Sequence, residues 1–264
     1  MAHAVVHFEI GGPDDLRLAE FYSGLFGWRV RPVPDADYAL IDTSGGAGIG
    51  GGIEPTGEGE QSVTFYIQAD DLQAVLDKVN LLGGKTVTPI TELVGMATYA
   101  KFEDPDGLVV GLVLGSADPG TGDRGRAGQV PGQAGSADPP AVAVAPSAGS
   151  GAPVDWFELS GADPDSAQRF YAEIFGWRVT QAAEGYRMID TGSARGIAGG
   201  IAAGLPGSWA TAYARVPDVA AALEAAAALG GRREYGPQAV GAGMHAGALR
   251  DPAGNVFGVY SRLG

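Results

Sequence analysis

His7 and Glu9 are the two residues of this 264-residue chain whose types and spacing best suit acid–base chemistry. They stand two positions apart in the segment VVHFEI (5–10), whose alternating pattern predicts a β-strand. Side chains two residues apart on a strand point to the same face, so an imidazole and a carboxylate would share one surface. A carboxylate beside an imidazole can raise its pKa and hold it for proton transfer. A polar pair satisfied inside a barrel is the alternative that we favour, because no third group evidently orients the two.

The segment around this pair occurs a second time, 149 residues further along the chain. HFEIGGPDDLRLAEFYSGLFGWRV (7–30) corresponds to WFELSGADPDSAQRFYAEIFGWRV (156–179), so that Trp156 and Glu158 match His7 and Glu9. The correspondence continues through three further pairs of segments: YALIDT (38–43) with YRMIDT (186–191), GIGGGI (48–53) with GIAGGI (196–201), and DPDG (104–107) with DPAG (251–254). An internal repeat of about 110 residues predicts two domains of ordinary size.

A segment rich in Gly, Ala, Pro and Ser separates the two copies. Such a composition cannot bury enough apolar surface to offset its ordering entropy, which predicts a flexible linker. We therefore expect one domain at 1–115, the linker at 116–153 and a second domain at 154–264. The linker is long enough that the sequence leaves open whether the domains form separate cavities or pair with each other.

Within each copy the pattern predicts a strand, a helix and three strands, twice over. In the first copy, apolar residues at helical spacing follow Asp14 and Asp15 and end at Gly27, and a second such run follows Asp71. Strands are expected at 28–33, 38–43 and 48–54 in the first unit, and at 62–69, 85–92, 97–103 and 108–114 in the second. The second copy repeats the plan with alanine-rich helices such as 219–231. The chain is thus expected to be α+β, with four βαβββ units.

These motifs resemble the vicinal oxygen chelate superfamily, which includes glyoxalase I, extradiol dioxygenases, and fosfomycin and bleomycin resistance proteins. The resemblance is carried by a first strand with a central His, the FY…LFGW helix exit, the Asp-Leu helix start and the strand–DPxG–strand ending. It covers both copies and is similar in detail to tandem glyoxalase-like proteins of actinobacterial type. It implies that two βαβββ units in each domain curl into an open, cupped mixed sheet that holds a ligand.

The metal ligands of that superfamily are mostly missing at the matching positions. His7 stands where a first His ligand is expected, but its counterpart in the second copy is Trp156. Positions for a second His and for a Glu hold Thr64 and Gly111, and in the repeat Thr211 and Gly258. A catalytic divalent metal generally needs about three protein ligands, so we expect no metal and no cofactor.

The inward-facing residues of the expected cups are candidate ligand contacts. Beyond the tentative catalytic pair His7 and Glu9, they are Thr64, Tyr66, Gly111, Trp156, Glu158, Thr211, Tyr213, His245 and Gly258. The two glycines would leave room for a ring, the two glutamates could anchor a cation, and the aromatic residues could stack a ligand. For each aromatic residue a role in the core is the alternative, and for His245 only its place on the seventh strand of its copy argues for a role.

Composition limits the partners. The net charge is −14, with 17 acidic against 6 basic residues in 1–115, which argues against binding nucleic acid and would attract a cation. Solubility alone also explains this charge. There is no cysteine, no signal-peptide pattern and no apolar stretch long enough to cross a bilayer, so a cytoplasmic protein without membrane contact is the default. A homodimer is compatible with the sequence, which does not fix the oligomeric state.

Two functions follow from these observations. The first is a metal-independent protein that binds a bulky aromatic or cationic metabolite, for drug sequestration and resistance or as an accessory of secondary metabolism. The second is a glyoxalase-type enzyme, a lyase, isomerase or hydroxylase-related protein, that uses His7 and Glu9 as an acid–base pair.

Overall fold

The structure of the protein is a computed structural model that describes residues 3–43, 48–57, 62–93, 95–115, 151–161, 163–203, 209–241 and 243–262. Each half repeats the order βαβββ twice, as the sequence predicted. The first half contains β1 (Val5–Gly12), α1 (Asp15–Phe26), β2 (Arg29–Pro32), β3 (Ala39–Asp42), β4 (Gly50–Pro55), β5 (Ser62–Ala69), α2 (Leu72–Leu81), β6 (Lys85–Leu93), β7 (Ala97–Glu103) and β8 (Val109–Leu114).

The second half follows the same order. It contains β9 (Val154–Gly161), α3 (Pro164–Phe175), β10 (Arg178–Ala183), β11 (Tyr186–Asp190), β12 (Ala198–Ala203), β13 (Trp209–Arg215), α4 (Val219–Ala228), β14 (Arg232–Gly241), β15 (Met244–Arg250) and β16 (Val256–Arg262).

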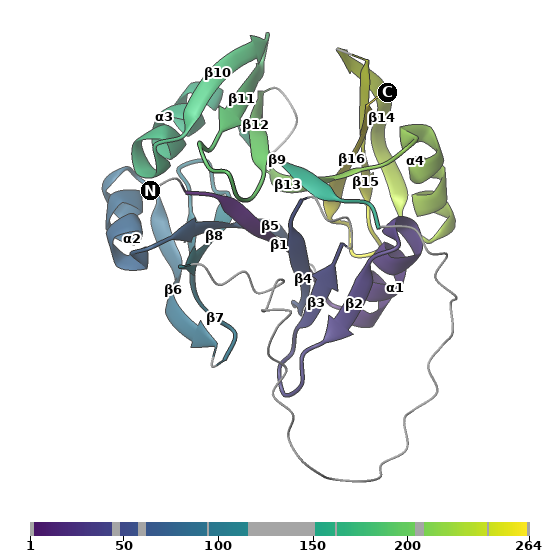
Figure 1. The fold of residues 1–264 in the computed structure, drawn as a ribbon, viewed down its shortest axis with the longest axis horizontal. Coiled ribbons are helices and arrows are strands. Elements are labelled where there is room, and N and C mark those ends of the chain that lie inside the picture. The colour runs from purple at the N-terminus through teal and green to yellow at the C-terminus, as the bar shows by residue number, and fades with distance from the viewer. Residues whose placement is uncertain are drawn as a thin grey trace.

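Each half forms its own eight-stranded mixed sheet. The orders are β2-β3-β4-β1-β5-β8-β7-β6 and β10-β11-β12-β9-β13-β16-β15-β14, so the two sheets have the same topology. Both sheets are strongly curved, and in Figure 1 the edge strands β2 and β6 face each other below while β10 and β14 face each other above. The two concave faces therefore open on opposite sides of the molecule, which confirms the expected α+β fold of two cupped sheets.

Helix ends are set by short polar and glycine signals. The Asp14 carboxylate caps α1 by accepting from the backbone N–H of Arg17, and Asp163 caps α3 in the same way. Gly27 and Gly176 end these helices with φ of 69° and 68°, a left-handed conformation that favours glycine. The FY aromatic side chains lie on the buried face of each helix, and Trp28 and Trp177, which follow directly after the helix ends, are buried as well.

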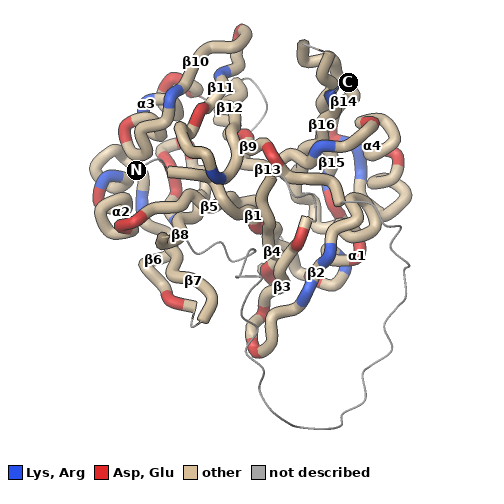
Figure 2. The backbone as a smooth tube through the Cα atoms, viewed as in Figure 1, with Lys and Arg blue, Asp and Glu red and all other residues tan. Residues whose placement is uncertain are grey.

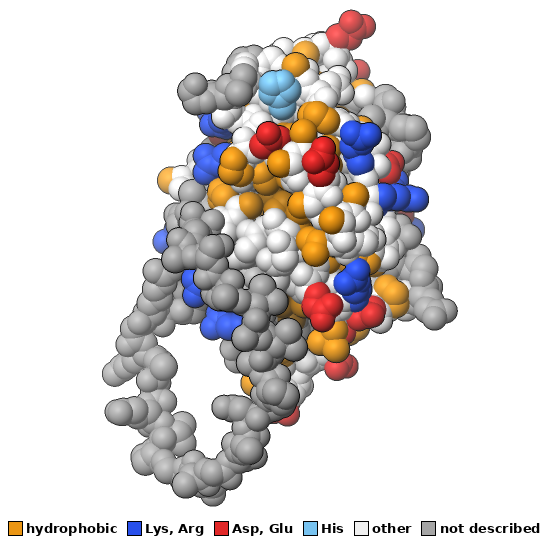
Figure 3. Space-filling model, turned by 90° about the vertical axis from the view of Figure 1, so that its right-hand side faces the viewer, with side chains coloured by type: hydrophobic (Ala, Val, Ile, Leu, Met, Phe, Trp, Pro, Cys, Tyr) orange, Lys and Arg blue, Asp and Glu red, His pale blue; other side chains and the backbone are white. Residues whose placement is uncertain are grey.

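The two halves pack against each other through the convex faces of their sheets. Helix α1 contacts α4 of the other half, and α2 contacts α3, so the helices pair on the two flanks of the molecule (Figure 1). In the shared core the rings of Phe65 and Phe157 lie with centroids 4.8 Å apart. On the flank with α1 and α4, apolar side chains are interspersed with charged ones (Figure 3).

Reciprocal backbone hydrogen bonds join each half to the start of the first strand of the other half. The backbone N–H of Ile49 donates to the carbonyl of Val154 at 2.8 Å, and that of Ile197 donates to the carbonyl of Val5 at 3.1 Å.

The indole N–H of Trp28 donates to Ala152 O at 2.7 Å. Ala152 belongs to the C-terminal end of the expected linker, so the described part of that segment is bound to the first half. Residues 116–150 lie outside the described residues, and the domain boundaries stay a prediction.

Among the described helices, none is long and apolar enough to cross a membrane.

Candidate functional site

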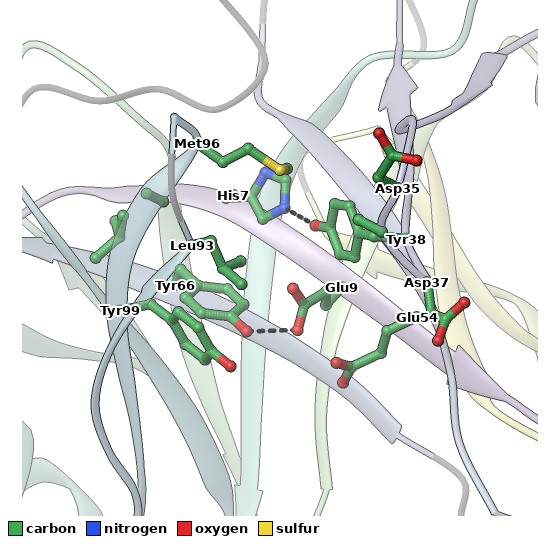
Figure 4. A pocket seen from close by; sticks show the side chains of 13 residues that line it. His7, Glu9, Asp35, Asp37, Tyr38, Glu54, Tyr66, Leu93, Met96 and Tyr99 are labelled. Atoms are coloured by element: carbon green, nitrogen blue, oxygen red, sulfur yellow. Dashed lines mark hydrogen bonds between the residues drawn. The ribbon is translucent and has the colours of Figure 1, made fainter.

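The concave face of the first sheet encloses a cavity of about 360 Å³. It is lined by His7, Glu9, Asp35, Ala36, Asp37, Tyr38, Glu54, Tyr66, Leu93, Met96, Ala97, Tyr99 and Val113. In Figure 4 the rings of Tyr38, Tyr66 and Tyr99 and the carboxylates of Glu9 and Glu54 lie around this space. Tyr38 comes from the loop between β2 and β3, and the other four come from strands. The loop between β2 and β3 carries two of the acids and lies at the lower edge of the molecule in Figure 2. The cavity thus combines aromatic walls with an excess of negative charge.

His7 and Glu9 both face this cavity, as the alternation of β1 predicted. The hydroxyl of Tyr38 lies 2.7 Å from His7 Nε2, so Tyr38 is the hydrogen-bond partner that orients the imidazole. Burial raises the pKa of Tyr38 well above its usual value, and the nearby Glu9 carboxylate raises it further. Tyr38 therefore lies between the imidazole and the carboxylate as a neutral hydroxyl. It supplies the third group that was not evident from the sequence.

Glu9 is the centre of a second set of polar contacts at the base of the cavity. Its carboxylate accepts a short hydrogen bond from the Tyr66 hydroxyl and pairs with Lys101 Nζ at 3.0 Å. The same ammonium lies 2.8 Å from the carboxylate of Glu54. Burial alone would lower the pKa of Lys101, but the carboxylates of Glu9 and Glu54 raise it above its ordinary value. Lys101 is therefore a charged ammonium held between two carboxylates.

Glycine positions in both cups are filled by the protein's own rings. A Cβ on Gly111 would lie 2.3 Å from Cδ1 of Tyr66, and a Cβ on Gly258 would lie 2.3 Å from Cδ1 of Tyr213. A Cβ on Gly52 would lie 1.9 Å from the hydroxyl oxygen of Tyr38. The glycines do leave room for a ring, as expected, but an internal tyrosine takes that room. Its position is what brings the hydroxyl onto Glu9.

The second cup reproduces the carboxylate and its tyrosine but changes the surroundings. The Tyr213 hydroxyl donates to Glu158 at 2.9 Å, and the indole N–H of Trp156 donates to the Tyr186 hydroxyl at 3.2 Å. Tyr235 adds a hydroxyl 3.0 Å from that of Tyr213. Burial raises the pKa of Glu158 to about 7, although hydrogen bonds from Tyr213 and Tyr186 act to lower it.

Thr64, Thr211 and His245 are the remaining residues that the sequence predicted for the two cups. Thr64 is buried and paired in register with Glu9, whereas the buried Thr211 donates its hydroxyl to the backbone carbonyl of Val256 at 2.8 Å. His245 shares a strand face with Gly247, whose added Cβ would meet side chains of α4. That is the helix side of the sheet, so the structure does not bring His245 together with Glu158.

The positions that hold a metal in the resembling superfamily do not form a metal site in this chain. Thr64 and Gly111 replace two ligands, and the ring of Tyr66 fills the space beside Gly111. The ammonium of Lys101 already pairs with the Glu9 carboxylate, and its positive charge repels a divalent cation. No group of three His, Cys, Asp or Glu that could hold a metal ion occurs in the described part of the chain. The residues present therefore do not fit the metal.

The sequence reasoning missed several residues of the two cups. Those that carry polar or aromatic groups are Asp35, Asp37, Tyr38, Glu54, Tyr99, Lys101, Tyr186 and Tyr235. Two signals could have found some of them: Tyr38 and Tyr186 open matched segments of the repeat, and Lys101 shares its strand face with Tyr99.

The fold and the repeat define the class of protein. The chain belongs to the glyoxalase/bleomycin resistance protein/dioxygenase superfamily, whose family model matches residues 4–112 and 154–259. A putative glyoxylase, CFP32, of Mycobacterium tuberculosis is 27% identical over 93% of this chain and 90% of that protein. The anthracycline biosynthesis protein DnrV of Streptomyces peucetius is also 27% identical, over 96% of this chain and 90% of that protein.

Solved structures share the fold at low sequence identity. The Mn(II)-bound glyoxalase from Novosphingobium aromaticivorans matches with a TM-score of 0.66 and 16% identity, over 99% of this chain and 84% of that one. The 2,3-dioxygenase LapB from Pseudomonas sp. KL28 matches with a TM-score of 0.66 and 14% identity, over 99% and 93% of the two chains. These similarities establish the fold and leave the chemistry to the residues of the cups.

Proposed function

We propose that this protein is a metal-independent binding protein whose first cup holds an aromatic metabolite that carries a positive charge. The observation that carries the proposal is the cavity of about 360 Å³ on the first sheet, with Tyr38, Tyr66 and Tyr99 on its walls. Its volume lies in the range of small-molecule sites, and aromatic walls with a few convergent polar groups are typical of such sites. We propose that this binding serves either drug sequestration and resistance or an accessory role in secondary metabolism.

The charge of the lining supports a cationic ligand. Glu9 and Glu54 share the single ammonium of Lys101, and two further acids, Asp35 and Asp37, line the same cavity and are exposed. The carboxylates therefore outnumber the cations around the cavity. A ligand cation entering between the acids and the tyrosine rings would be attracted by both, through Coulomb and cation–π interactions.

The named relatives support a role in the metabolism of polycyclic aromatic compounds. Two curated relatives are anthracycline biosynthesis proteins, DnrV of Streptomyces peucetius and DauV of a Streptomyces species. Anthracyclines are polycyclic aromatic compounds, and those with a basic amino sugar combine a ring system with a cation. We therefore propose an anthracycline with a basic amine as the first ligand to test with this protein.

The test is a calorimetric titration with an anthracycline that carries a basic amine, compared with its neutral N-acetylated form. The cationic form should bind more tightly, and the double variant Asp35→Asn, Asp37→Asn should remove that preference. Tyr99→Ala should weaken both forms by roughly threefold to tenfold, because it removes one aromatic wall. Glu224→Gln, an exposed acid on α4, is the matched control and should change nothing. Equal affinity for the two forms, or no binding of either, would contradict the proposal.

A glyoxalase-type enzyme that uses His7 and Glu9 as an acid–base pair is a second candidate function, and one observation favours it. His7, Tyr38 and Glu9 meet in the cavity, with Tyr38 oriented between the imidazole and the carboxylate. Such a group could move a proton on a bound ligand. Mass spectrometry of ligand incubated with the protein tests this directly. A product that disappears in His7→Ala, together with ligand binding that persists, would establish the enzyme, whereas unchanged ligand supports the binding protein.

A further inference from the structure

The second cup differs from the first in how its buried carboxylate is satisfied. In the first cup, Glu9 is neutralised by Lys101, which emerges from β7 opposite Gly111. In the second cup the same position on β15, opposite Gly258, holds Ala248. The repeat also places Ala202 where the first half has Glu54. The second cup therefore keeps the central carboxylate but lacks both the ammonium and the second acid.

Aromatic side chains take the place of those charges. Tyr235 is paired in register with Ala248 and directs its hydroxyl to within 3.0 Å of that of Tyr213. Tyr213 donates in turn to Glu158. Trp156 and Tyr186, joined by a hydrogen bond of 3.2 Å, form the opposite wall. Four aromatic residues from four strands thus surround a single carboxylate.

The carboxylate lies deep and the aromatic residues lead out to solvent. Glu158 is only 6% exposed, whereas Trp156, Tyr186 and Tyr235 are all half-buried. The only basic residue on the inner strands β9 and β13 of this sheet is Arg215, whose guanidinium lies 3.3 Å from Asp155. The hydrogen-bond partners of Glu158 among the described residues are the hydroxyls of Tyr213 and Tyr186, which are neutral. A buried carboxylate held by neutral hydroxyls alone is costly, and a ligand cation would relieve that cost.

We infer that the second cup is a separate site for an alkylated ammonium ion, with Glu158 as the counter-charge and Trp156, Tyr186, Tyr213 and Tyr235 as an aromatic cage. Recognition of methylated ammonium groups by aromatic rings is a well-established use of the cation–π interaction. The comparison of the two cups specifies the degree of alkylation. A primary ammonium has three N–H donors, and the first cup provides two carboxylates for Lys101. The second cup provides one carboxylate and ring faces, which suits a tertiary or quaternary amine.

The experiment is a calorimetric titration of the full chain with choline, ethanolamine and 3,3-dimethylbutan-1-ol. Choline and ethanolamine differ in the alkylation of the nitrogen, and the alcohol replaces the charged nitrogen of choline by carbon at nearly the same shape. Choline should bind at least tenfold more tightly than either analogue. Equal binding of choline and the alcohol, or the absence of choline binding at 10 mM, would overturn the inference.

Variants separate the second cup from the first. Glu158→Gln keeps the shape of the side chain and should weaken choline binding at least tenfold, while Glu54→Gln in the first cup should leave it unchanged. Because Glu158 is buried and its variant could be unstable, Ala248→Lys provides an independent test. It introduces the first cup's internal ammonium next to Glu158 and should abolish choline binding in a folded protein. Choline binding that persists in Ala248→Lys, or that is lost in Glu54→Gln, would overturn the assignment to the second cup. Because Glu158→Gln and Ala248→Lys leave the first cavity intact, failure here is distinguishable from failure of the proposed function.

Discussion

The hydroxyl of Tyr22 donates to Oδ2 of Asp251 at 3.0 Å, although 229 residues separate the two in the chain. The repeat makes the same contact in the opposite sense, since the Tyr171 hydroxyl donates to Asp104 at 2.9 Å. The tyrosine belongs to the FY motif and the aspartate to the DPxG turn, so two motifs of the repeat meet across the halves. The contact explains why the FY tyrosines are buried although they carry a hydroxyl: each one satisfies a buried carboxylate of the other half.

Removing the tyrosine hydroxyl should weaken the association of the halves. In Tyr22→Phe, Asp251 keeps its bonds from Asn255 but loses one donor in a buried setting. We expect a loss of about 2 kcal/mol in the free energy of unfolding, typical of a hydrogen bond to a charged group. Urea denaturation measures it. Tyr99→Phe, a half-buried tyrosine at the first cavity, should cost less than about 0.5 kcal/mol, and an equal loss in both variants would contradict the role of the Tyr22 contact.

Lys101 should be worth more to stability than the exposed lysines. Lys101→Ala leaves the buried carboxylate of Glu9 beside the half-buried carboxylate of Glu54 without a counter-charge, which should cost about 3 kcal/mol. The double variant Lys101→Ala, Glu54→Ala reproduces the composition of the second cup and should recover part of that loss, because it removes the like-charge repulsion. Lys85→Ala, whose ammonium is largely exposed beside Glu103, is the matched control and should cost under about 1 kcal/mol. Chemical denaturation of the variants tests this, and additive losses in the double variant would refute the coupling.

The glycine under each tyrosine ring should tolerate no side chain. Gly111→Ala places a methyl group against the ring of Tyr66, so the ring must move and its hydroxyl must leave Glu9. We expect a loss of about 1–3 kcal/mol in stability, as for other overpacked sites. Gly24→Ala on α1 meets only Leu229 at ordinary contact distance and should be neutral or slightly stabilising. A melting temperature of Gly111→Ala equal to that of the parent protein would show that Tyr66 is not fixed.

Glu158 should make the protein less stable as pH rises. Its folded pKa of about 7 lies above the ordinary value of 4.5, so the folded state holds the proton more strongly than the unfolded chain. Its stabilising contribution is therefore complete below pH 4.5 and is lost as pH rises through about 7, by roughly 3 kcal/mol in total. Because burial also raises the pKa of Asp104 and Asp251, the parent must be compared with Glu158→Gln. The difference in unfolding free energy between the two should shift in favour of the variant from pH 5 to pH 8, and a constant difference would rule out the shift.

The sequence predicted the elements well because their signals are local. Alternation in β1 placed His7 and Glu9 on one face, and Asp14 and Gly27 marked the ends of α1. The same signals in the second half made the repeat visible and led to the correct fold.

The partners of the site residues depended on contacts that no local pattern records. Tyr38 reaches His7 from the loop between β2 and β3, and Lys101 reaches Glu9 from β7. Gly111 was expected to leave a ring-sized space, but its occupant, Tyr66, follows only from the register of β5 and β8. His245 was selected for its place on the seventh strand of its copy, and strand parity places it on the helix side of the sheet. The docking of the halves could not be predicted because the long linker permits several arrangements.

The fusion of both halves in one chain has a consequence for how the cups can diverge. In a symmetric dimer of identical subunits, every substitution appears at both equivalent positions. Here Lys101 stands in one cup and Ala248 in the other, while the reciprocal Tyr22–Asp251 and Tyr171–Asp104 contacts are kept. Gene duplication within one chain thus separates two kinds of selection: the contacts between the halves are held in common, and each cup is free to specialise on its own.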